Sequence, residues 1–257
     1  MTGRLRPGAF GFGALVALAA VAFAISYAHA QDAGGGARAP DPALVERGRV
    51  LFQTGCTSCH GVEGQGTDQG PSLVGVGAAA ADFQLRTGRM PLAVSGKQAV
   101  RKPPAYDDAQ IDALVAYVAS LGPGPAVPDV DVGQADVVTG GQLYRANCAA
   151  CHNAAGTGGA LSYGHNAPSL LQATPVEVVE AMRTGPGQMP VFGPDAISDE
   201  EAADIARYVT GELQHPDDRG GFPLGATGPV PEGFVAWIVG IVVVGGALRW
   251  IVRGHHV

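Results

Sequence analysis

Cysteine is scarce in this sequence, and its placement excludes a disulfide framework. The chain of 257 residues has only 4 cysteines, all within two C-x-x-C-H units, CTSCH at residues 56–60 and CAACH at residues 148–152. No cysteine is left over to link distant segments of the chain. The two C-x-x-C-H units are therefore candidates for binding a metal or cofactor, or for thiol redox chemistry.

Aromatic residues and regular polar–apolar alternation are also lacking. Aromatic residues make up 6% of the sequence, against 39 glycines and 19 prolines, which is typical of small, loop-rich domains. No segment alternates for long enough to predict a sheet, whereas several show helical spacing. We predict all-α domains with so little apolar core that something bound, such as a metal or cofactor, must complete it.

Positive charge is in short supply in the middle of the chain. All 23 acidic residues lie between Asp32 and Glu232, together with 12 of the 16 basic residues, so this region carries 12 − 23 = −11. A field of that sign argues against a nucleic-acid partner. It fits either a basic protein partner or an ordinary solvated exterior.

Charge is absent from an apolar segment near each end. Residues 1–30 end in Ala-His-Ala, a site of the kind that signal peptidase cuts, and predict a signal peptide or, if uncut, an N-terminal membrane anchor. Residues 234–252 predict a transmembrane helix, with Trp237 and Trp250 at the two membrane interfaces. Arginines flank both segments on the side away from the acidic middle, which places the middle on the extracytoplasmic side of the cell membrane.

The middle contains an internal repeat. Each copy has a helical segment, a C-x-x-C-H unit, a Pro-Ser-Leu, an Arg-Thr-Gly with a following Met-Pro, and a second helical segment. This order predicts two copies of one small domain, residues 44–122 and 137–215, joined by an extended linker at 123–136. Residues 216–233 are then a tether to the membrane helix.

Each copy should begin and end with a helix. The first helices are predicted over residues 44–54 and 140–147. In the first copy Asp107 or Asp108 can cap the final helix, and in the second Ser198 and Glu201 form a capping box. The segments between the helices are interpreted as Gly/Pro-rich loops.

The C-x-x-C-H unit is compatible with three chemistries. A structural zinc site needs four ligands, and pairing the two units would leave surplus ligands. A redox dithiol would need a βαβ context, which the sequence lacks. A covalently attached haem needs two thiols and an adjacent histidine for the iron, which the unit supplies. Haem would also compensate for the small apolar core of each domain, because the porphyrin becomes part of that core.

The second iron ligand should be a soft donor on a downstream loop. Met90 and Met189 each precede proline and follow an Arg-Thr-Gly, and the chain has only 4 methionines. Met182 is either a competing ligand or, as we expect, a core residue. His165 is either an alternative ligand or a loop histidine at the surface or near a haem propionate. Tyr117 and Tyr208 match each other and pack near the haem edge or between helices.

The motifs CTSCH…GPSL…RTGRMP and CAACH…APSL…RTGPGQMP resemble the class I c-type cytochromes, twice over. The whole layout, with GPVPEGFVAWIVG before the last helix, resembles the dihaem cytochrome c subunits of the actinobacterial menaquinol–cytochrome c reductases over residues 44–253. The resemblance implies two covalently bound haem c groups. It assigns one to Cys56, Cys59, His60 and Met90, and the other to Cys148, Cys151, His152 and Met189.

The resemblance also implies partners and a role. Electrons would pass from the Rieske iron–sulfur subunit, beside a cytochrome b subunit, to a terminal cytochrome c oxidase. The complex would be a proton-translocating oxidoreductase, and this chain alone an electron carrier, because His/Met ligation closes both axial positions of iron. One alternative is an electron-accepting subunit of a periplasmic dehydrogenase or another oxidase. The other is a dihaem peroxidase, which would need an open iron site.

Overall fold

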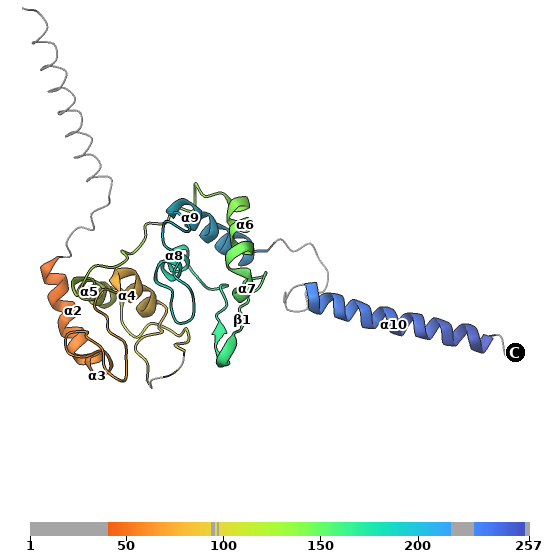
Figure 1. Cartoon of the computed structure of the whole chain (residues 1–257), viewed down its shortest axis with the longest axis horizontal. Coiled ribbons are helices and arrows are strands. Elements are labelled where there is room, and N and C mark those ends of the chain that lie inside the picture. Colours follow the sequence, from red (N-terminus) through yellow and green to blue (C-terminus); the bar gives the residue numbers. More distant parts are fainter. Residues whose placement is uncertain (1–40, 94–95, 97, 217–228, 255–257) are drawn as a thin grey trace, which may run out of the picture. The chain divides into compact units, whose positions relative to one another are not determined.

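The structure is a computed structural model that describes residues 41–93, 96, 98–216 and 229–254 (Figure 1). The predicted signal or anchor segment, residues 1–30, lies outside the described residues, as does most of the predicted tether. All described residues belong to one unit of the chain, Pro40–Val257.

In the first bundle, residues 41–122, the described residues form four helices. They are α2 (Pro42–Gly55), α3 (Thr57–His60), α4 (Gly77–Arg86) and α5 (Asp108–Ser120). Asp107 caps α5 in a capping box with Gln110, as an aspartate at this position predicts. Helix α2 packs against α5, burying Phe52 and Leu114 at 1% exposure each.

The second bundle, residues 136–216, repeats this arrangement. Its elements are α6 (Val137–Asn147), α7 (Ala149–His152), β1 (Gly159–Ala160), η1 (Ser162–Gly164), β2 (Asn166–Ala167), α8 (Pro175–Thr184), α9 (Asp199–Tyr208) and η2 (Val209–Leu213). The predicted capping box of Ser198 and Glu201 begins α9. Helix α6 packs against α9 as α2 does against α5. The antiparallel pair β1–β2, two residues in each strand, is a minor addition to a helical fold.

The prediction of loops between the first and last helices is corrected by the four-residue helices α3 and α7 and by two longer helices, α4 and α8. Helix α4 occupies residues 77–86 and α8 occupies residues 175–184. Helix α8 starts in a capping box of Thr174 and Glu177, a signal that the sequence offered, whereas α4 has no side-chain cap. Helices α4 and α8 have only 10 residues each, so their apolar residues repeat too few times to indicate a helix clearly. The first helices also start earlier than predicted, because Asp41 and Asp136 cap them.

Glycine makes the main helix crossing in each bundle possible. A Cβ added at Gly48 would lie 1.9 Å from the carbonyl oxygen of Ala113, and one at Gly140 would lie 2.0 Å from that of Asp204. Each glycine stands eight residues before the first cysteine of its unit. The backbones of α2 and α5, and of α6 and α9, approach so closely that no side chain fits between them.

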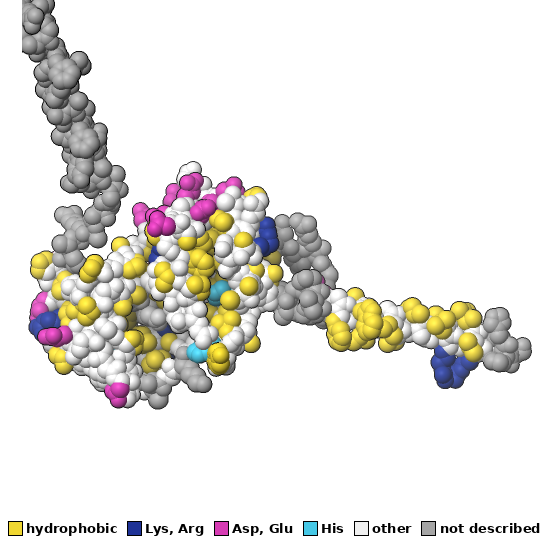
Figure 2. Space-filling model, in the orientation of Figure 1, with side chains coloured by type: hydrophobic (Ala, Val, Ile, Leu, Met, Phe, Trp, Pro, Cys, Tyr) yellow, Lys and Arg dark blue, Asp and Glu magenta, His cyan; other side chains and the backbone are white. Residues whose placement is uncertain are grey.

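Helix α10 (Pro229–Gly254) matches the predicted membrane segment. Residues Glu232–Gly254 have a mean hydropathy of 2.1, and within the described part of the chain this is the one helix long and apolar enough to cross a membrane. Figure 2 shows its hydrophobic side chains exposed along the helix, with the arginines toward its C-terminal end. Exposing these hydrophobic side chains to water is energetically unfavourable, whereas the hydrocarbon core of a membrane accommodates them.

Candidate functional site

A single cavity of about 550 Å³ brings both C-x-x-C-H units together. It lies between the two bundles, and side chains from both line it. All eight residues predicted to hold haem are among them: Cys56, Cys59, His60, Met90, Cys148, Cys151, His152 and Met189.

Both histidines are oriented by a proline carbonyl. Nδ1 of His60 lies 2.8 Å from the carbonyl oxygen of Pro71, and Nδ1 of His152 lies 2.9 Å from that of Pro168. Only the nitrogen can donate in such a bond, so Nδ1 carries the proton and Nε2 keeps its lone pair. Burial lowers the pKa of His152, which favours the neutral ring that ligates a metal. The sequence showed the matched prolines but not this role.

The cysteines lack the signature of a redox dithiol. Burial, with a smaller contribution from the neighbouring Cys59 and Cys151, raises the pKa of Cys56 and of Cys148 to about 11. A reactive dithiol would instead need a lowered pKa. The zinc alternative finds no support either, because the described residues include no group of three or more His, Cys, Asp or Glu placed to hold a metal ion.

Met90, Met182 and Met189 all line the cavity, but they differ in burial. Met90 and Met189 are half-buried and line the cavity, each on the loop that follows α4 or α8. Met182 is 2% exposed and lies in the core cluster of the second bundle, with Val179 and Ile205. The prediction that Met182 is a core residue is confirmed.

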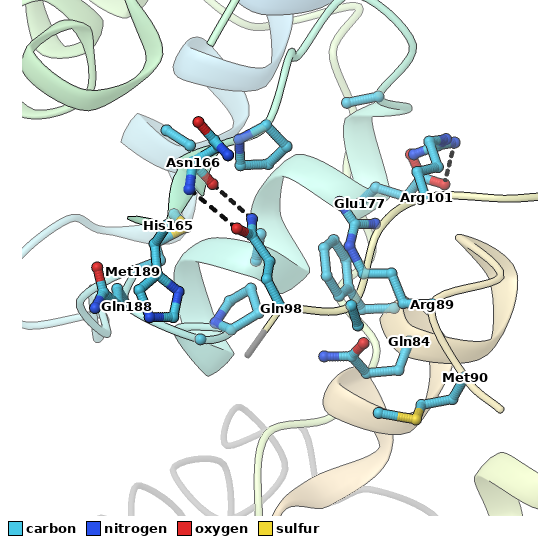
Figure 3. A pocket seen from close by; sticks show the side chains of 18 of the residues that line it. Gln84, Arg89, Met90, Gln98, Arg101, His165, Asn166, Glu177, Gln188 and Met189 are labelled. Atoms are coloured by element: carbon cyan, nitrogen blue, oxygen red, sulfur yellow. Dashed lines mark hydrogen bonds and ion pairs between the residues drawn. The ribbon is translucent and has the colours of Figure 1, made fainter. Parts of the chain in front are cut away.

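Three further side chains that the sequence singled out have defined positions. His165 lines the cavity and is half-buried (Figure 3). Tyr117 packs on Phe52 with ring centroids 5.0 Å apart, and Tyr208 packs on Tyr144 at 5.5 Å. Neither Tyr117 nor Tyr208 is among the described lining residues, which favours the helix-packing interpretation. Tyr144, which the sequence did not mark as a site residue, does line the cavity, and its hydroxyl donates to the carbonyl oxygen of Asn153 at 2.6 Å.

A loop of the first bundle contacts the second bundle through an ion pair and several hydrogen bonds. The guanidinium of Arg101 donates to both carboxylate oxygens of Glu177 on α8, at 2.9 and 3.0 Å. Gln98 exchanges two hydrogen bonds with the backbone of Asn166. Figure 3 shows both contacts at the wall of the cavity. The two bundles therefore share this wall.

Two carboxyl groups also meet where α4 packs against α8. Glu180 is fully buried, and neither of its oxygens has a hydrogen-bond donor among the described residues. The pKa of Glu180 is raised to about 9, mainly by burial and further by Asp82 and Glu177, while Arg86 opposes the rise. Glu180 is thus protonated at neutral pH and can donate to Asp82, which itself accepts from Arg86 at 2.8 Å. Arg86 also pairs with Asp108 and Asp112 of α5.

Stability is expected to fall as the pH rises toward 9. The folded chain keeps a proton on Glu180 that the unfolded chain, with an ordinary pKa of 4.5, releases, so folding loses this advantage between those two pH values. Glu180→Gln should flatten this part of the profile, because its amide stays neutral. Thermal denaturation followed by circular dichroism at several pH values measures the effect. The exposed Glu200→Gln is the control, and equal slopes for both variants would contradict the expectation.

Two family models match the chain. "Cytochrome c" matches residues 45–122, and "cytochrome C oxidase, cbb3-type, subunit III" matches residues 135–209. The "cytochrome bc1 complex cytochrome c subunit" of Mycobacterium tuberculosis is 47% identical over 220 residues, 81% of this chain and 78% of the relative. The protein of the same description from Corynebacterium diphtheriae is 42% identical over 233 residues, 84% and 83% of the two chains. The prediction of an all-α chain with two cytochrome c domains is confirmed.

Proposed function

Because the chain belongs to the family of cytochrome c subunits of the cytochrome bc1 complex, we propose that it takes electrons from a Rieske iron–sulfur subunit and passes them to a terminal cytochrome c oxidase. Its two cytochrome c domains carry two covalently bound haem c groups. The observation that best supports a relay is the single cavity on which both C-x-x-C-H units and both Met-Pro loops converge.

The residues of each bundle would divide the work of holding a haem. Cys56 and Cys59 would form the two thioether links of the first haem, and Cys148 and Cys151 those of the second. His60 and His152 would ligate iron through Nε2, since Nδ1 is committed to a proline carbonyl. Met90 and Met189, which line the cavity, would each supply a thioether sulfur as the second protein ligand of iron. The proposed haem domains are residues 44–122 and 137–215.

The protein's contribution is to hold and shield the cofactor. Bound haem c supplies a one-electron iron couple, and a methionine ligand raises its potential relative to a second histidine. The apolar walls, among them Phe83, Tyr144 and Val178, keep water from the porphyrin and favour the reduced state. If His60, Met90, His152 and Met189 ligate iron as proposed, neither iron would be open to a substrate, which would argue against a peroxidase role.

The chain associates with the membrane through α10, and we place its haem domains on the extracytoplasmic side. The proposed companions are a cytochrome b subunit, the Rieske subunit and the oxidase, which together would couple quinol oxidation to proton translocation. Acidic side chains gather over α9 (Figure 2), including the exposed Asp199 and Glu200. They offer a docking surface to a basic partner.

Purification from membranes in mild detergent tests the assignment. A tagged full-length chain is expected to bring with it a cytochrome b, a Rieske protein and oxidase subunits, and the preparation should consume oxygen on addition of quinol without added soluble cytochrome c. Untagged membranes carried through the same steps are the control. Recovery of a periplasmic dehydrogenase instead would favour the alternative role of an electron-accepting subunit, and a requirement for soluble cytochrome c would contradict the relay.

A further inference from the structure

Among the described residues, the cavity carries one positive charge that is not paired with a carboxylate of its own. Of the described residues that line it, three are charged: Arg89, Arg101 and Glu177. Both oxygens of Glu177 accept from Arg101, and one also accepts from the backbone of Thr174. The single carboxylate is therefore committed, and Arg89 remains as the uncompensated cation.

Arg89 is held where water cannot solvate it. Its side chain is 9% exposed, and its guanidinium carbon lies 4.7 Å from the centroid of the Phe83 ring. Nη1 is buried and has no hydrogen-bond partner among the described residues. A ring face stabilises a cation but accepts no ordinary hydrogen bond, so this buried donor stays unsatisfied in a residue that lines the cavity. Figure 3 shows Arg89 between Met90 and the pair of Arg101 and Glu177.

The second bundle has no such group at the matched position. Arg89 stands immediately before Met90, whereas Gln188 stands immediately before Met189. Gln188 is neutral and exposed. The two halves of the cavity therefore differ in charge beside otherwise equivalent methionines.

We propose that Arg89 binds a propionate carboxylate of the haem held in the first bundle and raises the reduction potential of that haem. The inference rests on the proposed haem ligands of the first bundle. Haem carries carboxylates as its only anionic side groups, and a guanidinium pairs with a carboxylate more strongly than any other side chain does. Neutralising a propionate next to iron removes negative charge that disfavours reduction, so the potential rises.

A redox titration of the purified full-length protein, followed in the visible haem bands, tests the proposal. Arg89→Gln is expected to lower one of the two midpoint potentials and leave the other in place, with two haems still present by pyridine haemochrome assay. Met189→His lowers the potential of the haem in the second bundle and so identifies the remaining component as that of the first. Arg89→Lys keeps the positive charge but loses the paired N–H donors of the guanidinium, so it should lower the midpoint potential by less than Arg89→Gln does.

A spectroscopic signature separates binding from a merely structural effect. The propionate bending modes in the resonance Raman spectrum should shift in Arg89→Gln, because they report hydrogen bonding to the carboxylate. The control is Arg49→Gln, the same change at an exposed site of the same bundle, where Arg49 pairs with Glu46; it should alter neither potentials nor Raman modes. The proposal is overturned if both potentials and the Raman modes stay at wild-type values, if only the second haem responds, or if both Arg89 variants lose haem. A haem count of two in the wild-type protein and in Arg49→Gln keeps these outcomes distinct from a failure of the proposed ligands.

Discussion

Replacing Cys148 and Cys151 together by alanine is expected to remove one of the two haems and to unfold the second bundle. The cavity wall of that bundle includes Tyr144, Ile205 and Val209, core side chains against which the porphyrin would pack. A domain this small has little other core to compensate. The pyridine haemochrome absorbance per polypeptide should fall by about half, because each C-x-x-C-H unit attaches one haem.

The matched control for this prediction is Met182→Leu. Met182 is buried beside the same cavity, and leucine conserves its volume, so the variant should keep both haems at a cost of less than about 1.5 kcal/mol in unfolding free energy. Limited proteolysis should cut the cysteine variant within residues 137–215 and spare residues 44–122. Two haems per chain in the double-alanine variant would refute the assignment of these cysteines.

Gly140→Ala is expected to destabilise the second bundle strongly, although it adds only one methyl group to helix α6. The new Cβ would overlap the carbonyl oxygen of Asp204, so α6 and α9 must separate and lose contacts along their length. Overpacking of this kind costs about 3 kcal/mol or more in unfolding free energy, because backbone rather than a flexible side chain must move. Thermal denaturation monitored by circular dichroism should show a clear drop in Tm.

Gly211→Ala is the matched control for that substitution. A Cβ there would meet nothing closer than Nε of Arg207 at 3.9 Å, so stability should be nearly unchanged. Gly48→Ala should behave like Gly140→Ala, because it closes on Ala113 in the first bundle. Equal Tm values for Gly140→Ala and Gly211→Ala would contradict the close crossing.

The sequence revealed those parts of the site that lie in short contiguous motifs. CTSCH and CAACH could be read directly, and the repeat made Met90 and Met189 stand out from Met182. The capping residues Asp107 and Ser198 were also visible locally. What it did not reveal depends on partners distant in the chain. Gly48 is informative only once Ala113 is known to lie against it, and Arg89 only once Glu177 is known to be taken by Arg101.

The two middle helices show a different limit. The start of α8 could have been found from Thr174 and Glu177, but α4 has no side-chain cap, and its alanine-rich segment has few apolar side chains large enough to mark a periodic face. Helix α4 is positioned by its contacts with α5 and α8. The pairing of Glu180 with Asp82 across that contact joins residues 98 positions apart, beyond the reach of any local pattern.

The wall shared by the bundles limits how the chain can be divided. Arg101 of one copy is anchored on Glu177 of the other, and α4 lies against α8, so each copy supplies part of its neighbour's enclosure. The two copies of the repeat are therefore not independent of each other, because each completes part of the other's enclosure. If the chain were cut between residues 123 and 136, each fragment would expose its side of the shared wall. A half taken from another lineage would not restore the contacts of that wall unless it carried matching residues.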